Sequence, residues 1–278
     1  MNIQSTLTAG LNYLQPSALR PFSYTFQPPP DTPWESGSYE LRPMPIADAR
    51  TAATPQHIER EGFELRDAPT AVRDFLDDAE VEAVYHREVA ELALAVTGGA
   101  RAYVFDHLVR RREADRTALS FGRRATEGRA AANGRIHNDY TEESGRRRLA
   151  LVLTDPEEAA AVRRYCIVNV WRSIKVPVLD TPLAVCDARS VMAKDLVSAE
   201  VRYPSRTGEI YLATHSPTHR WSYFSAMDRH EALVFKQYDS QLGGVSRFTP
   251  HAAFDHPETP ADAPLRESIE ARCLVVFE

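Results

Sequence analysis

The chain has few cysteines, no long apolar run and no excess of positive charge, and each of these absences excludes a class of protein. Its three cysteines, Cys166, Cys186 and Cys273, are isolated, so neither a disulfide framework nor a cysteine zinc site is expected. No window offers the run of about eighteen uncharged apolar residues of a membrane span, and residues 1–20 do not have the pattern of a signal peptide. A cytoplasmic protein is therefore expected.

The charge balance also argues against a polyanionic partner. Thirty-three basic and thirty-nine acidic residues give a formal net charge of -6, so nucleic acid binding is not expected. The chain contains neither GxGxxG nor a P-loop. Residues 101–148 nevertheless hold twelve arginines against seven acidic residues. This stretch is either a solvated loop surface or a patch that steers an acidic substrate, carrier or partner protein.

The length and composition favour a single domain over residues 1–278, with enough apolar residues for a sizeable core. Residues 1–69 include the proline-rich PPPDTP and RPMP segments, which predict an extended N-terminal arm packed on the domain. Residues 70–100 have apolar side chains at helical spacing. They predict one helix or a broken pair as a helical support, with Asp67 or Thr70 as its N-cap and a stop at Gly98-Gly99.

Residues 101–278 consist mainly of short β-rich runs separated by turns. Only Asp155 to Arg164 has a helical pattern in the second half of the chain, with Asp155 as the cap and Pro156 at the first helical position. Many short strands without intervening helices favour an antiparallel sandwich or barrel. The fold class is therefore mostly β with accessory helices.

The sharpest short motif is His137-Asn138-Asp139. On an extended segment, residues i and i+2 point to the same side, so this imidazole and this carboxylate can converge on one ion. His251, which follows Asp139 by 112 positions, is a candidate third ligand from a late strand. Two histidines and one carboxylate form the facial arrangement that leaves positions open at non-haem Fe(II).

A candidate anion site follows His251 by fifteen residues. Arg266 and Ser268 are again i and i+2 on a β-rich run, so a guanidinium and a hydroxyl can point the same way. This pair suits a carboxylate.

With these motifs the sequence resembles the Fe(II)/2-oxoglutarate-dependent oxygenase superfamily, whose double-stranded β-helix (a jelly-roll, cupin-like fold) carries H-x-D, a distal histidine and then an arginine, often as R-x-S. Over roughly residues 20–278, the segments NVWRSIKVPVLDTPLAVCDARSV, HRWSYF and RESIEARCLVVF resemble a family of natural-product hydroxylases and desaturases. That family includes the small component of cephamycin 7-alpha-methoxylation and the aspergillic acid hydroxylase.

The resemblance implies a mononuclear oxygenase that uses Fe(II), 2-oxoglutarate and molecular oxygen. Iron would be held by His137, Asp139 and His251, and the distal carboxylate of 2-oxoglutarate by Arg266 and Ser268. The reaction would oxidise a C–H bond of a small natural product or amino-acid derivative, by hydroxylation, desaturation or cyclisation. The resemblance also suggests that a strip of the strand containing NVWRSIK faces or supports the pocket, with Asn169, Trp171 and Arg172 as candidate substrate-binding residues.

Several alternatives stay open at this stage. His219 is a second candidate for the distal ligand, and His107 and His256 are expected to be structural or surface residues. Trp171 and Asn169 are as compatible with core packing as with substrate binding. The protein could also be an accessory subunit with a biosynthetic partner protein, or a cupin-type metal hydrolase or isomerase. A homodimer is the base-rate expectation.

Overall fold

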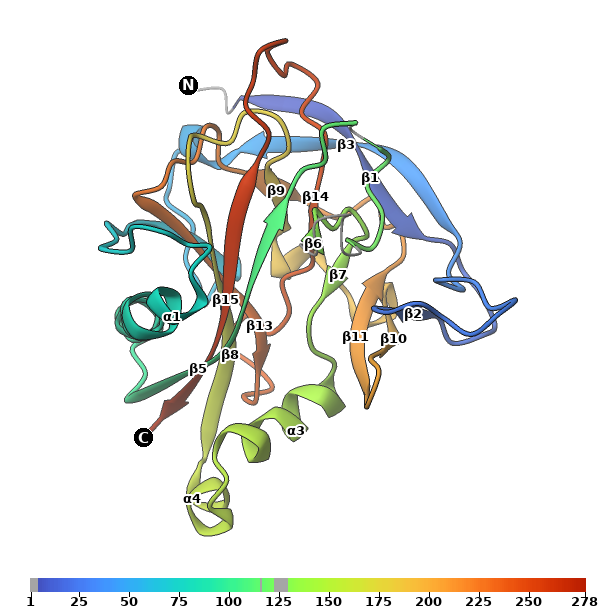
Figure 1. The fold of residues 1–278 in the computed structure, drawn as a ribbon. Coiled ribbons are helices and arrows are strands. Elements are labelled where there is room, and N and C mark those ends of the chain that lie inside the picture. Colours follow the sequence, from blue (N-terminus) through green and yellow to red (C-terminus); the bar gives the residue numbers. More distant parts are fainter. Residues whose placement is uncertain (1–4, 116, 123–129) are drawn as a thin grey trace.

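Two curled β-sheets face each other and account for most of the secondary structure in the computed structural model, which describes residues 5–115, 117–122 and 130–278 (Figure 1). The nine-stranded sheet has the order β1-β3-β12-β9-β14-β7-β11-β10-β2, and the six-stranded sheet has the order β4-β13-β8-β15-β5-β6. The chain is thus mostly β, as the strand pattern predicts.

The strands of the nine-stranded sheet are β1 (Thr6–Leu14), β2 (Phe22–Tyr24), β3 (Tyr39–Asp48), β7 (His137–Asn138), β9 (Leu183–Cys186), β10 (Leu196–Arg202), β11 (Thr207–Ala213), β12 (Trp221–Tyr223) and β14 (His251–Ala253). Those of the six-stranded sheet are β4 (Phe63–Asp67), β5 (Arg101–Arg111), β6 (Ala130–Ala131), β8 (Arg164–Ser173), β13 (Glu231–Asp239) and β15 (Glu267–Phe277). The helices are α1 (Asp78–Glu80), η2 (Val81–Tyr85), α2 (His86–Thr97), α3 (Glu142–Val152) and α4 (Pro156–Ala161), with short 3-10 turns η1 (Ala49–Thr51), η3 (Ala188–Ser190) and η4 (Ala193–Asp195).

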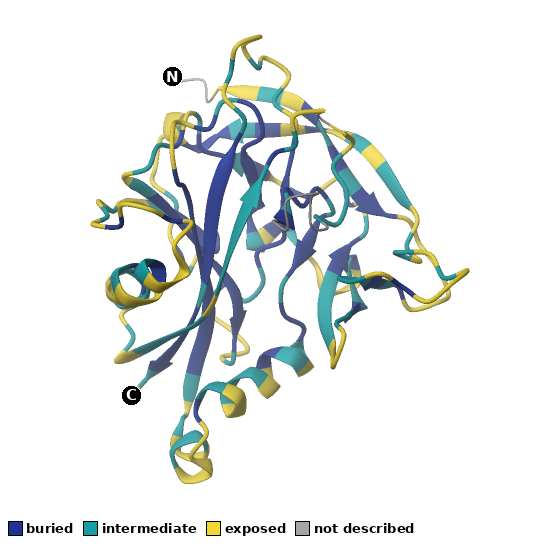
Figure 2. Cartoon of the chain, in the orientation of Figure 1, coloured by how far each residue is buried: buried dark blue, intermediate teal, exposed yellow. Residues whose placement is uncertain are grey.

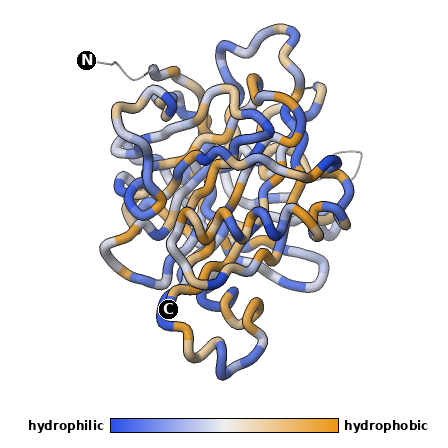
Figure 3. Tube along the Cα trace, turned by 90° about the vertical axis from the view of Figure 1, so that its left-hand side faces the viewer, coloured by the Kyte–Doolittle hydropathy of each residue, from blue (hydrophilic) through white to orange (hydrophobic). Residues whose placement is uncertain are grey.

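Strand β8, in the middle of the six-stranded sheet, is buried on both faces, which explains its nearly continuous apolar run. Its outer face packs on the helical layer through Val168 and Val170, and its inner face contributes Trp171 to a cluster that also contains Val185 of the other sheet. Figure 2 shows β8, β13 and β15 as a buried central band, and Figure 3 shows hydrophobic residues concentrated in the central strands.

The predicted helical support is present, but it begins later than expected. Asp77, rather than Asp67 or Thr70, caps the helix by accepting hydrogen bonds from the backbone N–H groups of residues 79 and 80. One π-helical stretch, η2, lies between α1 and α2, so the segment is a continuous helix with a local bulge. Gly98 ends it in the left-handed region, at φ 71°, as its position after the last apolar residue predicts.

The predicted N-terminal arm is not confirmed, because much of it forms strands of the nine-stranded sheet. β1 and β3 pair in antiparallel register over their whole length, and β3 continues into the sheet through β12. β3 contains Pro43 and Pro45, which have no backbone N–H to donate. On the side of β3 that faces β12, pairing is limited to Ile46 to Asp48, so no hydrogen bond from either proline is needed there. The prolines therefore restrict the pairing partner of β3 without excluding a strand.

The sheet also curls until β1 meets its middle strands again. Isolated bridges join Asn12 to Arg135 and Leu14 to Thr214, which flank β7 and β11. β1 and β3 thereby help to enclose an apolar cluster that includes Leu11, Ile46 and Ile136. β1 and β3 therefore belong to the same sheet as β7 and β14, which carry the site described below.

α4 confirms the predicted helix, because Asp155 caps it and Pro156 occupies its first turn, but it ends at Ala161 and Arg164 already begins β8. α3 is a helix that the polar sequence EESGRRRLALV did not reveal. A capping box between Thr141 and Ser144 fixes its start, and only Gly145 is fully buried along its length. Within the described ranges, no helix is long and apolar enough to cross a membrane.

Candidate active site

The three predicted metal ligands come together between the two sheets. His251 on β14 pairs directly with His137 on β7, and the centroids of their rings lie 4.2 Å apart. Asp139 follows β7 by one residue, with its Oδ1 3.5 Å from His137 Nε2. One ligand atom from each of the three residues lies within 4.8 Å of the others. In the described part of the chain, this is the one group of His, Cys, Asp or Glu side chains with that geometry.

Backbone carbonyls orient both imidazoles in the same way. His137 Nδ1 lies 2.8 Å from the carbonyl oxygen of Arg135, and His251 Nδ1 lies 3.3 Å from that of Thr249. Because a carbonyl can only accept, each Nδ1 carries the proton and each Nε2 keeps its lone pair. This tautomer leaves Nε2 of each histidine able to bind a metal ion, and Asn133 Nδ2 lies 3.3 Å from Nε2 of His137.

The carboxylate of Asp139 is held by one of its two oxygens. Oδ2 accepts hydrogen bonds from Asn169 Nδ2 and from Arg272 Nε, each at 2.8 Å. Oδ1 is the oxygen on the side of His137. This division leaves one oxygen for a metal while the other fixes the orientation of the side chain.

Buried amides tie the ligand segments to the six-stranded sheet. Gln237 on β13 accepts a hydrogen bond from the backbone N–H of Asp139 (2.7 Å) and donates one to the carbonyl oxygen of Thr249 (3.0 Å). Asn138 donates to the carbonyl oxygen of Gln237 and accepts from the backbone N–H of Thr249. The segments that carry Asp139 and His251 are therefore fixed to the same strand.

The local charges favour the ligand-competent protonation states. Burial raises the pKa of Asp139, but the charge of Arg272 and the contact with His137 outweigh burial and hold this pKa well below its usual range. Burial and the neighbouring His137 lower the pKa of His251 well below its usual range. At neutral pH the site therefore offers a carboxylate and a neutral imidazole.

Arg266 and Ser268 lie in a second buried polar cluster. Arg266 precedes β15, donates from Nη1 to the carbonyl oxygen of Thr181 (2.9 Å) and has its guanidinium 5.4 Å from the ring centroid of Trp171. Within residues 5–115, 117–122 and 130–278, no hydrogen-bond partner is found for Arg266 Nε, Ser268 Oγ or Thr181 Oγ1. Burial, followed by the charge of Arg110, lowers the pKa of Arg266 to about 10.

Apolar contacts connect this cluster to the histidine pair. The ring centroid of Phe235 lies 4.8 Å from that of His251, and Phe235 belongs to the same apolar cluster as Trp171. The polar cluster and the candidate metal centre are therefore parts of one interior region.

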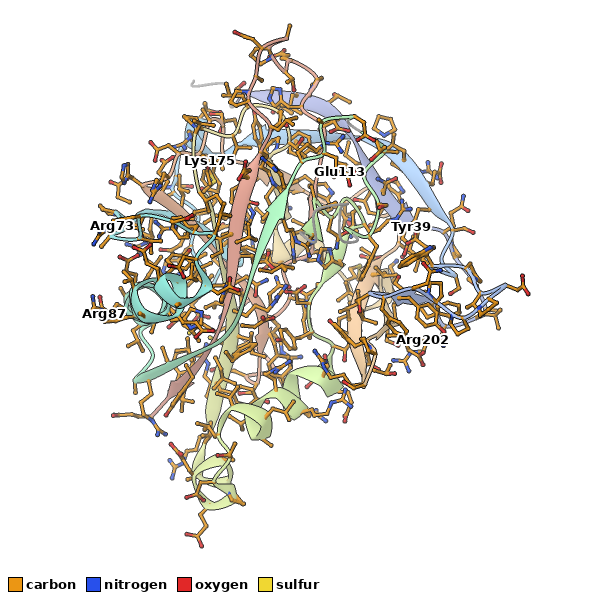
Figure 4. All side chains as sticks on the ribbon, viewed as in Figure 1. Tyr39, Arg73, Arg87, Glu113, Lys175 and Arg202 are labelled. Carbon is orange, nitrogen blue, oxygen red and sulfur yellow. The ribbon has the colours of Figure 1, made fainter. Side chains whose placement is uncertain are left out.

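A cavity of about 930 Å³ opens beside His137 and Asp139. Its walls come from β5, α3, the hairpin between β10 and β11, and residues 24–34. Arg202 on β10, labelled in Figure 4, contacts the last of these walls, because its guanidinium lies over the rings of Phe22 and Tyr24. A volume of this order lies in the upper part of the range of small-molecule sites.

Asn169, Trp171 and Arg172 have three different surroundings. Because successive residues of a strand point to opposite faces, Asn169 and Trp171 share one face of β8 and Arg172 lies on the other. Asn169 points inward and contacts Asp139, whereas Trp171 points inward and contacts Arg266. Arg172 points to the helical layer, where it donates to Tyr85 Oη and to the carbonyl oxygen of Ala68. None of the three is among the residues that line the described cavity.

The other histidines considered from the sequence lie elsewhere. His219 is buried between Tyr13, whose Oη lies 3.0 Å from its Nδ1, and Asp195, whose Oδ2 lies 3.3 Å from its Nε2. His107 contacts His86, and His256 contacts Tyr223. None of them joins the candidate ligand group.

Two residues of the site were missed by reasoning from the sequence. Arg272 was detectable, because the alternation that places Arg266 and Ser268 on one face of a strand continues through Glu270 to Arg272. Gln237 gives no comparable signal, since its role depends on where β13 lies relative to the H-x-D segment.

Comparisons with known proteins agree with this site. Residues 11–276 match a family model described as "Oxidoreductase/YMDC permease-like domain". The hydroxylase/desaturase efuI of Hormonema carpetanum is 31% identical over 261 residues, which cover 86% of this chain and 85% of efuI. The Fe(II)/2-oxoglutarate-dependent dioxygenase nvfI of Aspergillus novofumigatus is 32% identical over 245 residues, covering 86% and 78%.

A solved structure of the iron and alpha-ketoglutarate-dependent endoperoxidase NvfI superimposes with a TM-score of 0.86 at 25% identity, covering 98% of both chains. The chain therefore belongs to this family of Fe(II)/2-oxoglutarate-dependent oxygenases. Its cofactor is Fe(II), and 2-oxoglutarate and molecular oxygen are its co-substrates.

Proposed function

We propose that His137, Asp139 and His251 are the Fe(II) ligands of this oxygenase. The observation that carries the proposal is the two-histidine, one-carboxylate set, in which His137 Nε2 lies 3.5 Å from Asp139 Oδ1 and one ligand atom of each residue lies within 4.8 Å of the others. This donor set is the one that non-haem Fe(II) oxygenases use, because it leaves positions open for other ligands. His219 does not fit this role, since both of its nitrogens contact Tyr13 or Asp195.

Arg266 and Ser268 are proposed to bind the distal carboxylate of 2-oxoglutarate. Their buried atoms without partners in the described part of the chain, together with Thr181 Oγ1, fit an anionic acceptor. The hydrogen bonds between a guanidinium and a carboxylate are strong when both groups are shielded from water. Binding of this carboxylate also gives a reason for the buried cation at Arg266, because burial lowers the pKa of its guanidinium.

When bound, Fe(II) couples the oxidative decarboxylation of 2-oxoglutarate to the oxidation of a substrate by molecular oxygen. The side chains of this protein position the reactants. Arg272 and Asn169 keep Asp139 ionised and fixed, and Gln237 holds the segments of Asp139 and His251 in register. Phe235 and Trp171 give the region between His251 and Arg266 an apolar lining.

The substrate is proposed to be a small natural product that occupies the cavity beside His137 and Asp139 and is hydroxylated, desaturated or cyclised at a C–H bond. The names of the relatives, a hydroxylase/desaturase and an endoperoxidase, support this range of reactions. We further propose that the two sheets form the double-stranded β-helix. A single domain over residues 1–278, a homodimer, a biosynthetic partner protein and a cytoplasmic location stay predictions.

An anaerobic visible spectrum tests the ligand assignment. The protein is titrated with Fe(II) and then with 2-oxoglutarate, and the broad charge-transfer band of the chelate is recorded. We expect this band in the parent protein and in His219→Ala, and its loss in His251→Ala. Loss in His219→Ala with a folded protein, or a band that persists in His251→Ala, would overturn the assignment of the distal ligand.

A further inference from the structure

One face of α3 forms part of the cavity wall. Ser144, Arg147, Arg148 and Leu151 all line the cavity, and their spacing of i, i+3, i+4 and i+7 places them on a single helical face. Arg146, the neighbour on the same helix, instead forms an i, i+4 pair with Glu142 and does not line the cavity. The helix therefore presents two arginines to the cavity and keeps a third on another face.

The cavity arginines have little compensating charge. Arg148 lies over the rings of Phe105 and Tyr140, and no acceptor for its buried Nε is found among the described residues. Arg206, at the turn between β10 and β11, lies over the ring of Tyr203. In the ranges that the structure describes, no carboxylate pairs with Arg147, Arg148 or Arg206.

The acidic residues that line the same cavity are already engaged. Asp106 accepts a hydrogen bond from Arg272, and Glu209 pairs with Arg20 and accepts from Thr141. Asp139 is the candidate metal ligand. The guanidinium groups of Arg147, Arg148 and Arg206 therefore leave an excess of positive charge at this part of the cavity.

The remaining walls are largely apolar. Leu151 has 61% of its surface exposed although it lines the cavity, and the rings of Phe26, Trp34 and Tyr203 line it as well. A large exposed apolar side chain beside a concave surface is typical of a ligand contact. The cavity thus combines an apolar surface with a cationic one.

We infer that the substrate is an amphipathic anion: an apolar small molecule whose carboxylate or similar anionic group is bound by Arg147, Arg148 and Arg206. This inference rests on the proposed function, because it takes the cavity beside the candidate iron ligands as the substrate site. It assigns α3 and the β10–β11 hairpin the task of orienting the substrate. It also narrows the function of the arginine-rich stretch: Arg147 and Arg148 bind the substrate, whereas Arg146 belongs to a solvated surface.

Two fluorescent probes that share a ring system test this inference. 8-Anilinonaphthalene-1-sulfonate carries an anionic group, and N-phenyl-1-naphthylamine is its uncharged counterpart. Both are titrated into the full chain with 2-oxoglutarate in excess, so that the dye does not enter the Arg266 cluster. We expect Arg147→Gln/Arg148→Gln to weaken binding of the sulfonate about tenfold and to leave the uncharged probe within about twofold.

Two further variants serve as controls. Arg146→Gln removes the same charge from another face of α3 and should leave both probes unchanged. Leu151→Glu introduces a negative charge at an exposed position and should weaken the sulfonate more than the uncharged probe. Equal effects of Arg147→Gln/Arg148→Gln on both probes, or an effect of Arg146→Gln as large as that of the double variant, would overturn the inference.

The dye titration needs neither iron nor turnover, so its result does not depend on the assignment of the iron ligands. The double variant should still show the charge-transfer band with Fe(II) and 2-oxoglutarate, because Arg147 and Arg148 do not contact the candidate ligands. Equal weakening of both probes in the double variant, together with a normal band, overturns the substrate class alone. Selective weakening of the anionic probe in the double variant, together with no band in the parent protein, overturns the proposed function alone.

Discussion

The buried cluster around Asp239 and the buried cluster around Arg266 both contain charged side chains in the protein interior, but their hydrogen bonding differs. Asp239 accepts hydrogen bonds from Lys236 and Arg164, and Glu59 pairs with both of these cations. The Arg266 cluster, by contrast, keeps polar atoms on three side chains for which the described residues supply no partner. A buried charged group whose hydrogen bonds are all made within its own chain contributes to the folded structure. A buried charged group with polar atoms left without partners indicates a ligand site.

The same contrast separates the arginines of the six-stranded sheet from those on α3 and the β10–β11 hairpin. Arg172 is fully satisfied between β8 and the helical layer, and Arg272 is fully engaged by Asp139, Glu270 and Asp106. Arg147 and Arg206, at the cavity, have no acidic partner in the part of the chain that the structure describes. The number of arginines in the sequence is therefore less informative about ligand binding than which of them have acidic partners.

The largest effect on stability is expected when a charge is removed from the cluster around Asp239, whose charged groups are paired with one another. Lys236→Met leaves the buried Asp239 with one cation fewer, so we expect the free energy of unfolding to fall by about 3–5 kcal/mol. Urea denaturation measures this loss. The affinity for 2-oxoglutarate of the protein that remains folded should not change, and a change larger than about threefold would show that the two clusters are not separate.

The opposite result is expected when the unsatisfied cluster is changed. Arg266→Met removes the proposed partner of a carboxylate, so 2-oxoglutarate should bind more weakly by about 2–5 kcal/mol, at least about thirtyfold. Iron binding should be retained, and the melting temperature of the iron-free protein should not fall, because an incompletely paired buried cation has been replaced by an apolar side chain.

Isothermal titration with 2-oxoglutarate and a thermal melt together check this prediction. A cupin-type hydrolase or isomerase that does not use 2-oxoglutarate would show little effect of Arg266→Met on turnover. A large drop in the melting temperature would instead place Arg266 among the residues that stabilise the fold.

The smallest expected effect concerns pH. Burial raises the pKa of Asp239, but its hydrogen bonds with Arg164 and the charge of Lys236 outweigh burial and lower this pKa below its ordinary value of 3.8. A lowered folded-state pKa contributes stability above the unfolded-state value, and this stability is lost as pH falls through the folded-state pKa. The melting temperature of the parent protein should therefore decline below about pH 4.

Asp239→Asn should flatten this acid limb and lower the melting temperature at neutral pH. Melting curves between pH 3 and 7 for the parent and the variant measure both effects. If the melting temperature of Asp239→Asn falls as steeply at acid pH as that of the parent protein, other carboxylates cause the loss of stability.

Much of the site was predictable because strand geometry acts locally. The i, i+2 spacing of His137 and Asp139 places both side chains on one side of any extended segment, and the same rule pairs Arg266 with Ser268. The helix that begins after Asp155 was also predictable, since an N-cap followed by proline is a local signal.

The late start of the first helix was not predictable in the same way. Asp67, Thr70 and Asp77 are all suitable caps by residue type, and tertiary packing selects among them.

The N-terminal strands and α3 show where local signals fail. The prolines of β3 argue against a strand only until its pairing partners are known, and α3 has too polar a sequence to predict its place beside the cavity. The alternation along β8 likewise determines that Arg172 and Trp171 face opposite ways, but only the second sheet and the helical layer decide which of them faces the site.

The sequence by itself determined the candidate side chains for the chemistry: an imidazole and a carboxylate at strand spacing, a later histidine, and an arginine with a serine. Only the tertiary structure decided that His251 rather than His219 stands beside His137, because that choice depends on the antiparallel pairing of β14 with β7. It also decided which arginines are paired. Local geometry is encoded within a few residues, whereas the pairing of strands and charges far apart in the chain is settled by packing.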